Sequence, residues 1–171
     1  MGAYPVTALR AAREADAEAI AVIYNQGIAE RQATFETEPR VAADVREWLA
    51  AGDALLVAEQ GEAVVGWARA HPYSARPAYR GVRECSIFVD RAARGRGAGA
   101  ELLEALAAEC ERRGDWKLVG RLFASNRPSI ALMRGCGFRD VGVHRRHGRL
   151  EGQWRDVLLV ERLLGEALDE S

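Results

Sequence analysis

A loop rich in glycine and arginine carries the clearest chemistry in the sequence. It spans Arg94–Gly99, follows the apolar run Ser86–Val89 and leads directly into an amphipathic segment. Glycines let a backbone approach a ligand without Cβ clashes, and the unpaired N–H groups at a helix N-terminus suit a phosphate. Arg94 and Arg96 add charge-assisted donors. These features predict a phosphate-binding loop, with a flexible surface turn as the alternative.

The same loop also satisfies the GxGxxA fingerprint of dinucleotide-binding folds, over Gly95–Ala100. That fingerprint places its glycines directly after a strand, whereas five residues separate Val89 from Gly95. It also needs an acidic residue at the end of the next strand, and Asp115 precedes that strand. The context therefore argues against a Rossmann domain.

Glu84 is the second group that could do chemistry, because it is a carboxylate within a mainly apolar strand, Val82–Val89. Strand alternation puts it on the face opposite Cys85 and Ile87. A carboxylate shielded from water there suits a general base. The alternative is an exposed strand glutamate paired with Arg83 or Arg69.

The bulk composition excludes several classes of protein. The chain has 171 residues and a formal net charge of -1, whereas nucleic-acid and membrane-surface binders need a surplus of Lys and Arg. No apolar run approaches the length that crosses a bilayer, and no secretory signal is visible at the N-terminus. Cys85, Cys110 and Cys136 lack CxxC spacing, so we expect reduced thiols, no metal site and a cytoplasmic location.

The hydrophobic periodicity of the sequence predicts the strands and helices that must position these groups. Asp16 is expected to cap the first helix, and Gly52 to follow the second. Expected strands are Val6–Arg10, Ala54–Gln60, Ala63–His71, Val82–Val89, Lys117–Phe123, Asp140–His147 and Trp154–Arg162. Expected helices run from Asp16 to about Glu30, from Ala42 to Ala51, from the glycine loop to about Arg113, and from Ser129 to about Arg134. This order indicates one α/β (α+β) domain over 1–171, with its core at about 6–164, around a mixed sheet.

Two motifs resemble the GNAT superfamily of N-acetyltransferases. Arg94-x-x-Gly97-x-Gly99 is similar to the pyrophosphate loop of that superfamily, and Ser125–Phe138 is similar to its second signature, which ends here in Cys-Gly-Phe. Gly137 is a plausible end of the helix in that signature. The resemblance implies the GNAT fold, a mostly antiparallel sheet of about seven strands flanked by about four helices. It also implies a splayed bulge in the central strand where acetyl-CoA binds.

The resemblance further implies which residues hold acetyl-CoA. Backbone groups of the central strand would pair with pantetheine, the loop amides would hold the pyrophosphate, and Asn126 would contact the cofactor arm. The implied cofactor residues are Ile87, Phe88, Val89, Arg94, Gly95, Arg96, Gly97, Ala98, Gly99, Asn126 and Ser129.

Four further segments resemble the phosphinothricin acetyltransferase branch, whose members act on phosphinothricin, methionine sulfoximine or arsinothricin. The segments are Ile23–Asn25, Thr34–Pro39, Ala75–Tyr79 and Gly152–Asp156, and the resemblance spans about residues 7 to 164. It implies Glu84 as the general base that frees the amine, with direct attack on the thioester and the Val89 N–H as oxyanion donor. Phe35, Arg76 and Tyr79 would bind the acceptor, and the enzyme would be a homodimer.

Two positions depart from that branch. Met133 stands where many members have Tyr or His, and methionine donates no proton, so the general acid is unassigned. Glu151 stands where the branch often has His. Two alternative functions stay open: acetylation of another amine (a protein N-terminus, a polyamine or an aminoglycoside), or a non-catalytic acyl-CoA-binding module. For Trp154 and Asp156, a role in the site and a structural role are equal alternatives. His71, His144 and His147 lack the spacing of metal ligands or of a catalytic triad.

Overall fold

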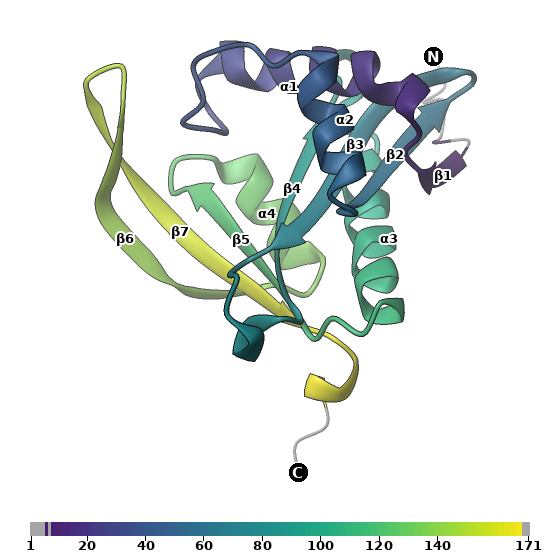
Figure 1. Cartoon of the computed structure of the whole chain (residues 1–171). Coiled ribbons are helices and arrows are strands. Elements are labelled where there is room, and N and C mark those ends of the chain that lie inside the picture. The colour runs from purple at the N-terminus through teal and green to yellow at the C-terminus, as the bar shows by residue number, and fades with distance from the viewer. Residues whose placement is uncertain (1–5, 7, 169–171) are drawn as a thin grey trace.

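The computed structural model describes residue 6 and residues 8–168 of the chain, and Figure 1 shows a single sheet flanked by helices. The strands are β1 Ala8–Ala11, β2 Ala54–Gln60, β3 Ala63–Pro72, β4 Val82–Val89, β5 Lys117–Phe123, β6 Arg139–Leu150 and β7 Gln153–Leu163. The helices are α1 Ala17–Glu30, α2 Ala42–Ala50, α3 Ala98–Arg112 and α4 Arg127–Gly135. The predicted order of elements and the α/β class are confirmed.

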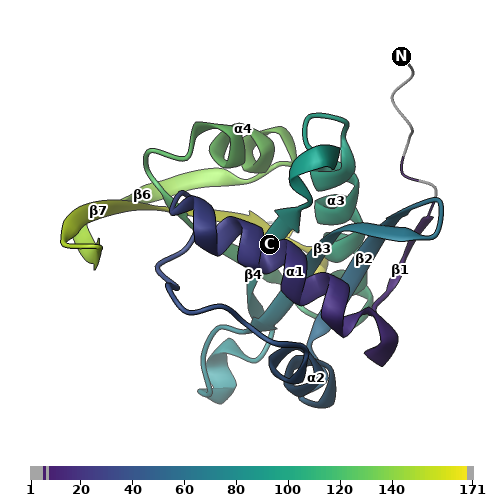
Figure 2. The ribbon, with the colours of Figure 1, turned by 90° about the horizontal axis from the view of Figure 1, so that it is seen from above.

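The described strands form one seven-stranded sheet in the order β1-β2-β3-β4-β5-β7-β6. Only the β4–β5 pairing is parallel among the pairings of these residues, so the sheet is mixed and mostly antiparallel, as predicted. Apolar residues of α1 and α2 pack with Trp67 on one face of the sheet. Apolar residues of α3 and α4 pack with Leu118 on the other face. Figure 2 shows these two helix layers on opposite sides of the strands.

The parallel pairing of β4 with β5 is short, and this opens the middle of the sheet. It covers Val82–Glu84 against Lys117–Val119 and ends there. Beyond it β4 continues to Val89 without β5 beside it, and the two strands diverge. The register between β3 and β4 is unbroken from Gly66–Val89 to Pro72–Arg83. The splay that the family resemblance implies is therefore present, but it arises from strand divergence and not from a β-bulge in the β3–β4 pairing.

The N-terminal elements differ from the sequence prediction. Among the described residues the first strand covers Ala8–Ala11 and so extends one residue beyond the predicted end, whereas Thr7 of the predicted strand lies outside the described residues. A short 3₁₀ turn, Glu14–Asp16, precedes α1, and the Asp16 side chain makes no capping bond to that helix. The Asp16 carboxylate instead accepts from the Arg13 N–H at 2.7 Å and from the Arg10 guanidinium at 2.7 and 2.9 Å. The predicted cap was wrong because a charged partner from β1 competes for the same oxygens.

The C-terminal elements are longer than predicted. Helix α4 begins two residues earlier, because the Asn126 side chain accepts from the Ser129 N–H and caps it. Its other end has the predicted glycine: Gly137 adopts φ +80, and the Phe138 N–H bonds back to the Met133 carbonyl at 3.1 Å. Strands β6 and β7 form a hairpin whose far end projects away from the helices in Figure 1. No helix among the described residues has both the length and the apolar character needed to cross a bilayer.

Candidate active site

A cavity of about 640 Å³ lies where the open edge of β4 meets the start of α3. It brings together all the predicted cofactor residues except Arg96: Ile87, Phe88, Val89, Arg94, Gly95, Gly97, Ala98, Gly99, Asn126 and Ser129. Arg96 is exposed in the same loop. The loop, the strand edge and the start of α4 thus enclose one space.

The glycines of this loop have the backbone that their prediction required. Gly95 has φ +73 and Gly97, directly before α3, has φ +93, a region that residues with a Cβ rarely adopt. The first intrahelical bond of α3 runs from the Glu101 N–H to the Gly97 carbonyl at 3.1 Å, so the preceding amides are free of helical partners. A Cβ at Gly99 would meet the Leu132 side chain at 3.1 Å. The turn therefore fits a close-lying anion.

The Arg94 guanidinium has partners within the protein. Its Nε donates to the Val89 carbonyl at 3.1 Å, and its Nη1 donates to the Glu30 carboxylate of α1 at 2.9 Å. Arg91 also binds Glu30, at 2.9 Å. Arg94 therefore ties the loop to α1 in this structure, and its direct contact with a phosphate stays a prediction.

The open edge of β4 presents backbone groups to the cavity. The Asp90 N–H donates to the Val65 carbonyl at 2.8 Å, so Asp90 faces β3. Because backbone groups alternate in direction along a strand, Val89 and Ile87 face the opposite way, towards the opening. The contact of Arg94 with the Val89 carbonyl lies on that side. The two residues predicted to pair with pantetheine thus direct their backbone into the gap between β4 and β5.

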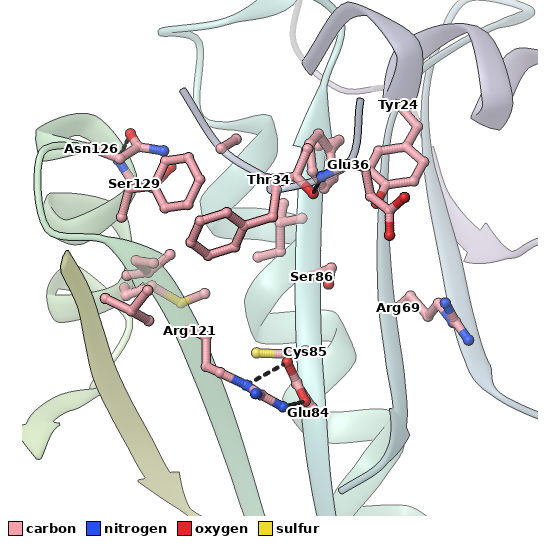
Figure 3. Close-up of a pocket in the computed structure, with 18 of the residues that line it drawn as sticks. Tyr24, Thr34, Glu36, Arg69, Glu84, Cys85, Ser86, Arg121, Asn126 and Ser129 are labelled. Atoms are coloured by element: carbon pink, nitrogen blue, oxygen red, sulfur yellow. Dashed lines mark hydrogen bonds and ion pairs between the residues drawn. The ribbon is translucent and has the colours of Figure 1, made fainter. Parts of the chain in front are cut away.

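A second cavity of about 670 Å³ adjoins the first on the α1–α2 face of the sheet. Its walls come from β3, β4, β5, the start of α4, the loop between α1 and α2, and the β6–β7 hairpin. The two cavities share a wall made by Ala33, Ile87, Phe88, Asn126, Ser129 and Leu132. Figure 3 shows Asn126 and Ser129 on one side of this space and Glu84 on the other. Groups bound in the two cavities would therefore meet beside β4.

Phe35 forms part of the wall of the second cavity. Its ring meets that of Phe123 edge to face, with 4.7 Å between centroids, and lies so close to Gly148 that a Cβ there would meet it at 2.6 Å. The side chain is still 38% exposed. Phe35 therefore lines the second cavity, as predicted for an acceptor-site residue, and also packs against Phe123.

Glu84 lies in the second cavity and is bound to a side chain that sequence reasoning missed. The Arg121 guanidinium of β5 donates from Nε to Oε1 at 2.9 Å and from Nη2 to Oε2 at 2.5 Å (Figure 3). This contact with Glu84 raises the pKa of Arg121. Arg83 and Arg69, the partners expected in the alternative interpretation, bind other carboxylates. The surroundings of Glu84 are thus ionic, and not purely apolar as expected.

A signal for Arg121 was present in the sequence. It is a charged residue inside a strand whose neighbours Leu122 and Phe123 are apolar, which is the same pattern that identified Glu84. Only the pairing of β4 with β5 brings the two side chains together across 37 positions of sequence.

Cys85 and Met133 belong to the core. Cys85 is 5% exposed and packs with residues of α3, although it also lines the second cavity. Burial raises the pKa of its thiol to about 12, which disfavours the nucleophilic thiolate. Met133 is 4% exposed and lines the second cavity, where its thioether has no proton to donate. The structure therefore offers neither residue as an acyl carrier or a general acid.

Arg76 and Tyr79 do not meet the other predicted site residues. Both are exposed on the loop between β3 and β4, outside the lining of the two cavities. The Tyr79 ring contacts that of Tyr73, with 6.0 Å between centroids. Their predicted contact with an acceptor therefore stays a prediction.

Several residues that the sequence left open have structural partners at the β6–β7 hairpin. The Asp156 carboxylate accepts from the Arg146 N–H at 2.7 Å, and Trp154 is 49% exposed beneath the Arg149 guanidinium. Glu151 pairs with Arg31 at 2.9 Å.

The histidines form no metal site. The rings of His144 and His147 stack at 4.5 Å, and His71 and His147 both line the second cavity. Within residues 6 and 8–168, no three His, Cys, Asp or Glu side chains group as metal ligands.

Comparisons with known proteins point to one family. The model of the acetyltransferase (GNAT) family matches residues 11–138. A phosphinothricin N-acetyltransferase from Alcaligenes faecalis is 36% identical, covering 91% of this chain and 82% of the relative. An L-methionine sulfoximine/L-methionine sulfone acetyltransferase from Pseudomonas paraeruginosa is 31% identical, over 90% of this chain and 92% of the relative.

Among solved structures, a phosphinothricin acetyltransferase from Sinorhizobium meliloti, crystallised with acetyl-CoA, superimposes with a TM-score of 0.90 and 32% identity. The match covers 97% of this chain and 92% of that one.

Proposed function

Because this chain belongs to the acetyltransferase (GNAT) family, we propose that it moves an acetyl group from acetyl-CoA to the α-amino group of a small, glutamate-like amino acid. It is an acetyl-CoA-dependent N-acetyltransferase, and acetyl-CoA is its cosubstrate. The observation that carries the proposed acetyl transfer is the pair of adjoining cavities, one fitted to an anion and the other holding Glu84.

The first cavity is the proposed acetyl-CoA site. The amides from Gly95 to Gly99, at the positive end of the α3 dipole, would hold the diphosphate. The backbone of Ile87 and Val89 would pair with the pantetheine arm, and Asn126 and Ser129 would flank it where the two cavities meet. The cosubstrate supplies a thioester, which this placement would bring to the wall shared with the second cavity.

The second cavity is the proposed acceptor site, and Glu84 is the proposed base. An α-ammonium group carries a proton near neutral pH that must leave before the nitrogen can attack. Glu84 would take that proton, the freed nitrogen would attack the thioester carbon to form the new N–C bond, and the C–S bond would break to release the CoA thiolate. The attacking nitrogen would lose its second proton to solvent as the amide forms. The Val89 N–H would donate to the developing oxyanion. A thiolate leaves readily at a thiol pKa of about 8.5, so solvent can protonate it and Met133 need not.

The acceptor class rests on the relatives and on the charge of the cavity. Both named relatives acetylate amino acids that carry a second polar or anionic head. The cavity lining holds Arg40, Arg69 and Arg121 against Glu36 and Glu84, and this small excess of positive charge favours an anionic acceptor over a polyamine. Phe35 would pack on the acceptor, while Arg76 and Tyr79 would reach its head group from the loop between β3 and β4. Phosphinothricin, methionine sulfoximine and arsinothricin are the candidate acceptors.

The proposal includes a homodimer and a cytoplasmic location. The β6–β7 hairpin exposes apolar side chains that a second copy could cover: Val141 is 49% exposed, Val143 52% and Trp154 49%. The cytoplasmic location rests on the predicted reduced state of the cysteines, all of which are free and buried.

A thiol-release assay with acetyl-CoA and a panel of amines tests the proposal. The panel holds L-phosphinothricin, L-methionine sulfoximine, arsinothricin, a peptide with a free N-terminus, spermidine and an aminoglycoside. We expect the amino acids to be acetylated with the highest kcat/KM. A preference for the peptide or a cationic amine would refute the acceptor class, and CoA binding without acetylation of any amine would favour a non-catalytic module.

A further inference from the structure

Arg121 has one edge of its guanidinium bound and another edge open. Nε and Nη2 both bind Glu84, which leaves the edge made by Nη1 and the second proton of Nη2. An arginine fork of this kind matches a carboxylate in a bidentate contact. We propose that this open edge of Arg121 binds the α-carboxylate of the acceptor and so selects α-amino acids over other amines. The inference rests on the proposed function, which it makes more specific.

The position of Arg121 in β5 directs it into the acceptor cavity. Leu122 packs with the core on the α3–α4 face, so alternation places Arg121 and Phe123 on the opposite face. Both line the cavity that holds Glu84. In spite of its ion pair the Arg121 side chain is 48% exposed, against 18% for that of Glu84. A ligand in the cavity can therefore reach the guanidinium.

The dimensions of an α-amino acid fit this arrangement. Its nitrogen and its carboxyl carbon are both bonded to Cα, so they lie about 2.5 Å apart. Each carboxylate oxygen of Glu84 accepts one bond from Arg121, and about one lone pair on each oxygen is left for the amine. An amine held at Glu84 would therefore place its own carboxylate within a few ångströms of the guanidinium that Glu84 binds.

The other arginines of the cavity are less suited to this task. Arg69 pairs with Asp53 at 2.7 Å and lies over the Trp48 ring at 4.2 Å. Arg40 pairs with Glu36 at 3.0 Å. Within the described part of the chain, neither forms a hydrogen bond or an ion pair with Glu84. Neither would therefore lie next to an acceptor carboxylate, whose carbon is two bonds from the reacting nitrogen. Arg40 is the rival, since its buried Nε has no partner among the described residues.

The test compares L-methionine sulfone with its α-carboxamide as acceptors. Both present the same amine to Glu84, but only the acid presents a carboxylate to Arg121. The readout is the ratio of kcat/KM for the acid to kcat/KM for the amide. In Arg121→Leu and Arg121→Gln we expect this ratio to fall about 10- to 100-fold, as for loss of a charged hydrogen bond. The change should lie mainly in the KM of the acid.

Arg112→Leu is the matched control. Arg112 also binds a glutamate through Nε and Nη2, at 2.9 and 2.8 Å, but on the surface of α3 away from both cavities. Its ratio should equal that of the wild type. Calorimetric titration with acetyl-CoA should show unchanged affinity in every variant, which confirms that the variants are folded.

The outcomes separate this inference from the proposed function. If the wild type acetylates neither acceptor nor any other amino acid, the proposed function fails and the inference fails with it. If the wild type is active but both acceptors lose rate equally in the Arg121 variants, Arg121 acts only through Glu84 and the inference alone is overturned. A fall of the ratio in Arg40→Gln with no change in the Arg121 variants would assign the carboxylate to Arg40 and also overturn it.

Discussion

Replacing Glu84 by Gln tests the base at the centre of the mechanism. Glutamine keeps the shape of the side chain but cannot take a proton, and a general base contributes about 100- to 10,000-fold to a rate. We therefore expect kcat to fall at least about 100-fold. Glutamine also offers Arg121 one oxygen where Glu84 offers two. Because the two side chains are 18% and 48% exposed, losing this pair should cost at most about 1 kcal/mol, or about 2–4 °C in Tm.

Three readouts make the result decisive: thiol release with saturating acceptor, calorimetric titration with acetyl-CoA, and Tm. The control is Glu161→Gln, because Glu161 is also a strand glutamate in an ion pair, with Lys117 at 3.0 Å, but lies outside both cavities. It should keep wild-type turnover. Wild-type turnover in Glu84→Gln, or an equal loss of turnover in both variants, would exclude Glu84 as the general base.

Three further predictions follow from the structure. Gly97→Ala and Gly114→Ala should each lower the free energy of unfolding by about 1–2 kcal/mol, because both positions have φ near +90. Calorimetry should show weaker binding of acetyl-CoA, by about tenfold, only for Gly97→Ala. Equal affinities in the two variants would remove the loop from the cofactor site. Cys85→Ser should stay active, since burial raises the pKa of the Cys85 thiol to about 12; loss of turnover in a folded variant would reopen a covalent route. The hydrogen bond from Arg10 lowers the pKa of Asp16 below its ordinary value of 3.8. This bond therefore stabilises the fold above about pH 4, and the stabilisation is lost as pH falls through the pKa of Asp16 in the folded protein. The Tm difference between wild type and Asp16→Asn should shrink as the pH is lowered through this range, and a constant difference would contradict the prediction.

The sequence predicted the fold well because its elements are strongly patterned. Strands β4 and β5 have the predicted bounds, since each is a mainly apolar segment that ends at a charged residue or a loop. Errors occurred where a partner from another element decides the outcome. Asp16 was expected to cap α1, but Arg10 of β1 binds its carboxylate.

The candidate site was predictable where local backbone decides its geometry, and less so where side chains from distant elements meet. The conformation of the glycine loop Arg94–Gly99 depends only on local backbone geometry, and the structure places this loop at the start of α3 as predicted. The partner of Glu84 could not be derived, because the pairing of Arg121 depends on where the β4–β5 ladder ends. In the same way Glu30, 64 positions away in sequence, binds Arg94.

A crystal structure of the chain with bound acetyl-CoA would show whether the two cavities act together as proposed. We expect the diphosphate on the amides of Gly95–Gly99, the pantetheine along β4 opposite β3, and the thioester at the wall shared by the two cavities, facing Glu84. A diphosphate bound away from the start of α3, or a thioester turned away from the cavity that holds Glu84, would contradict the proposal.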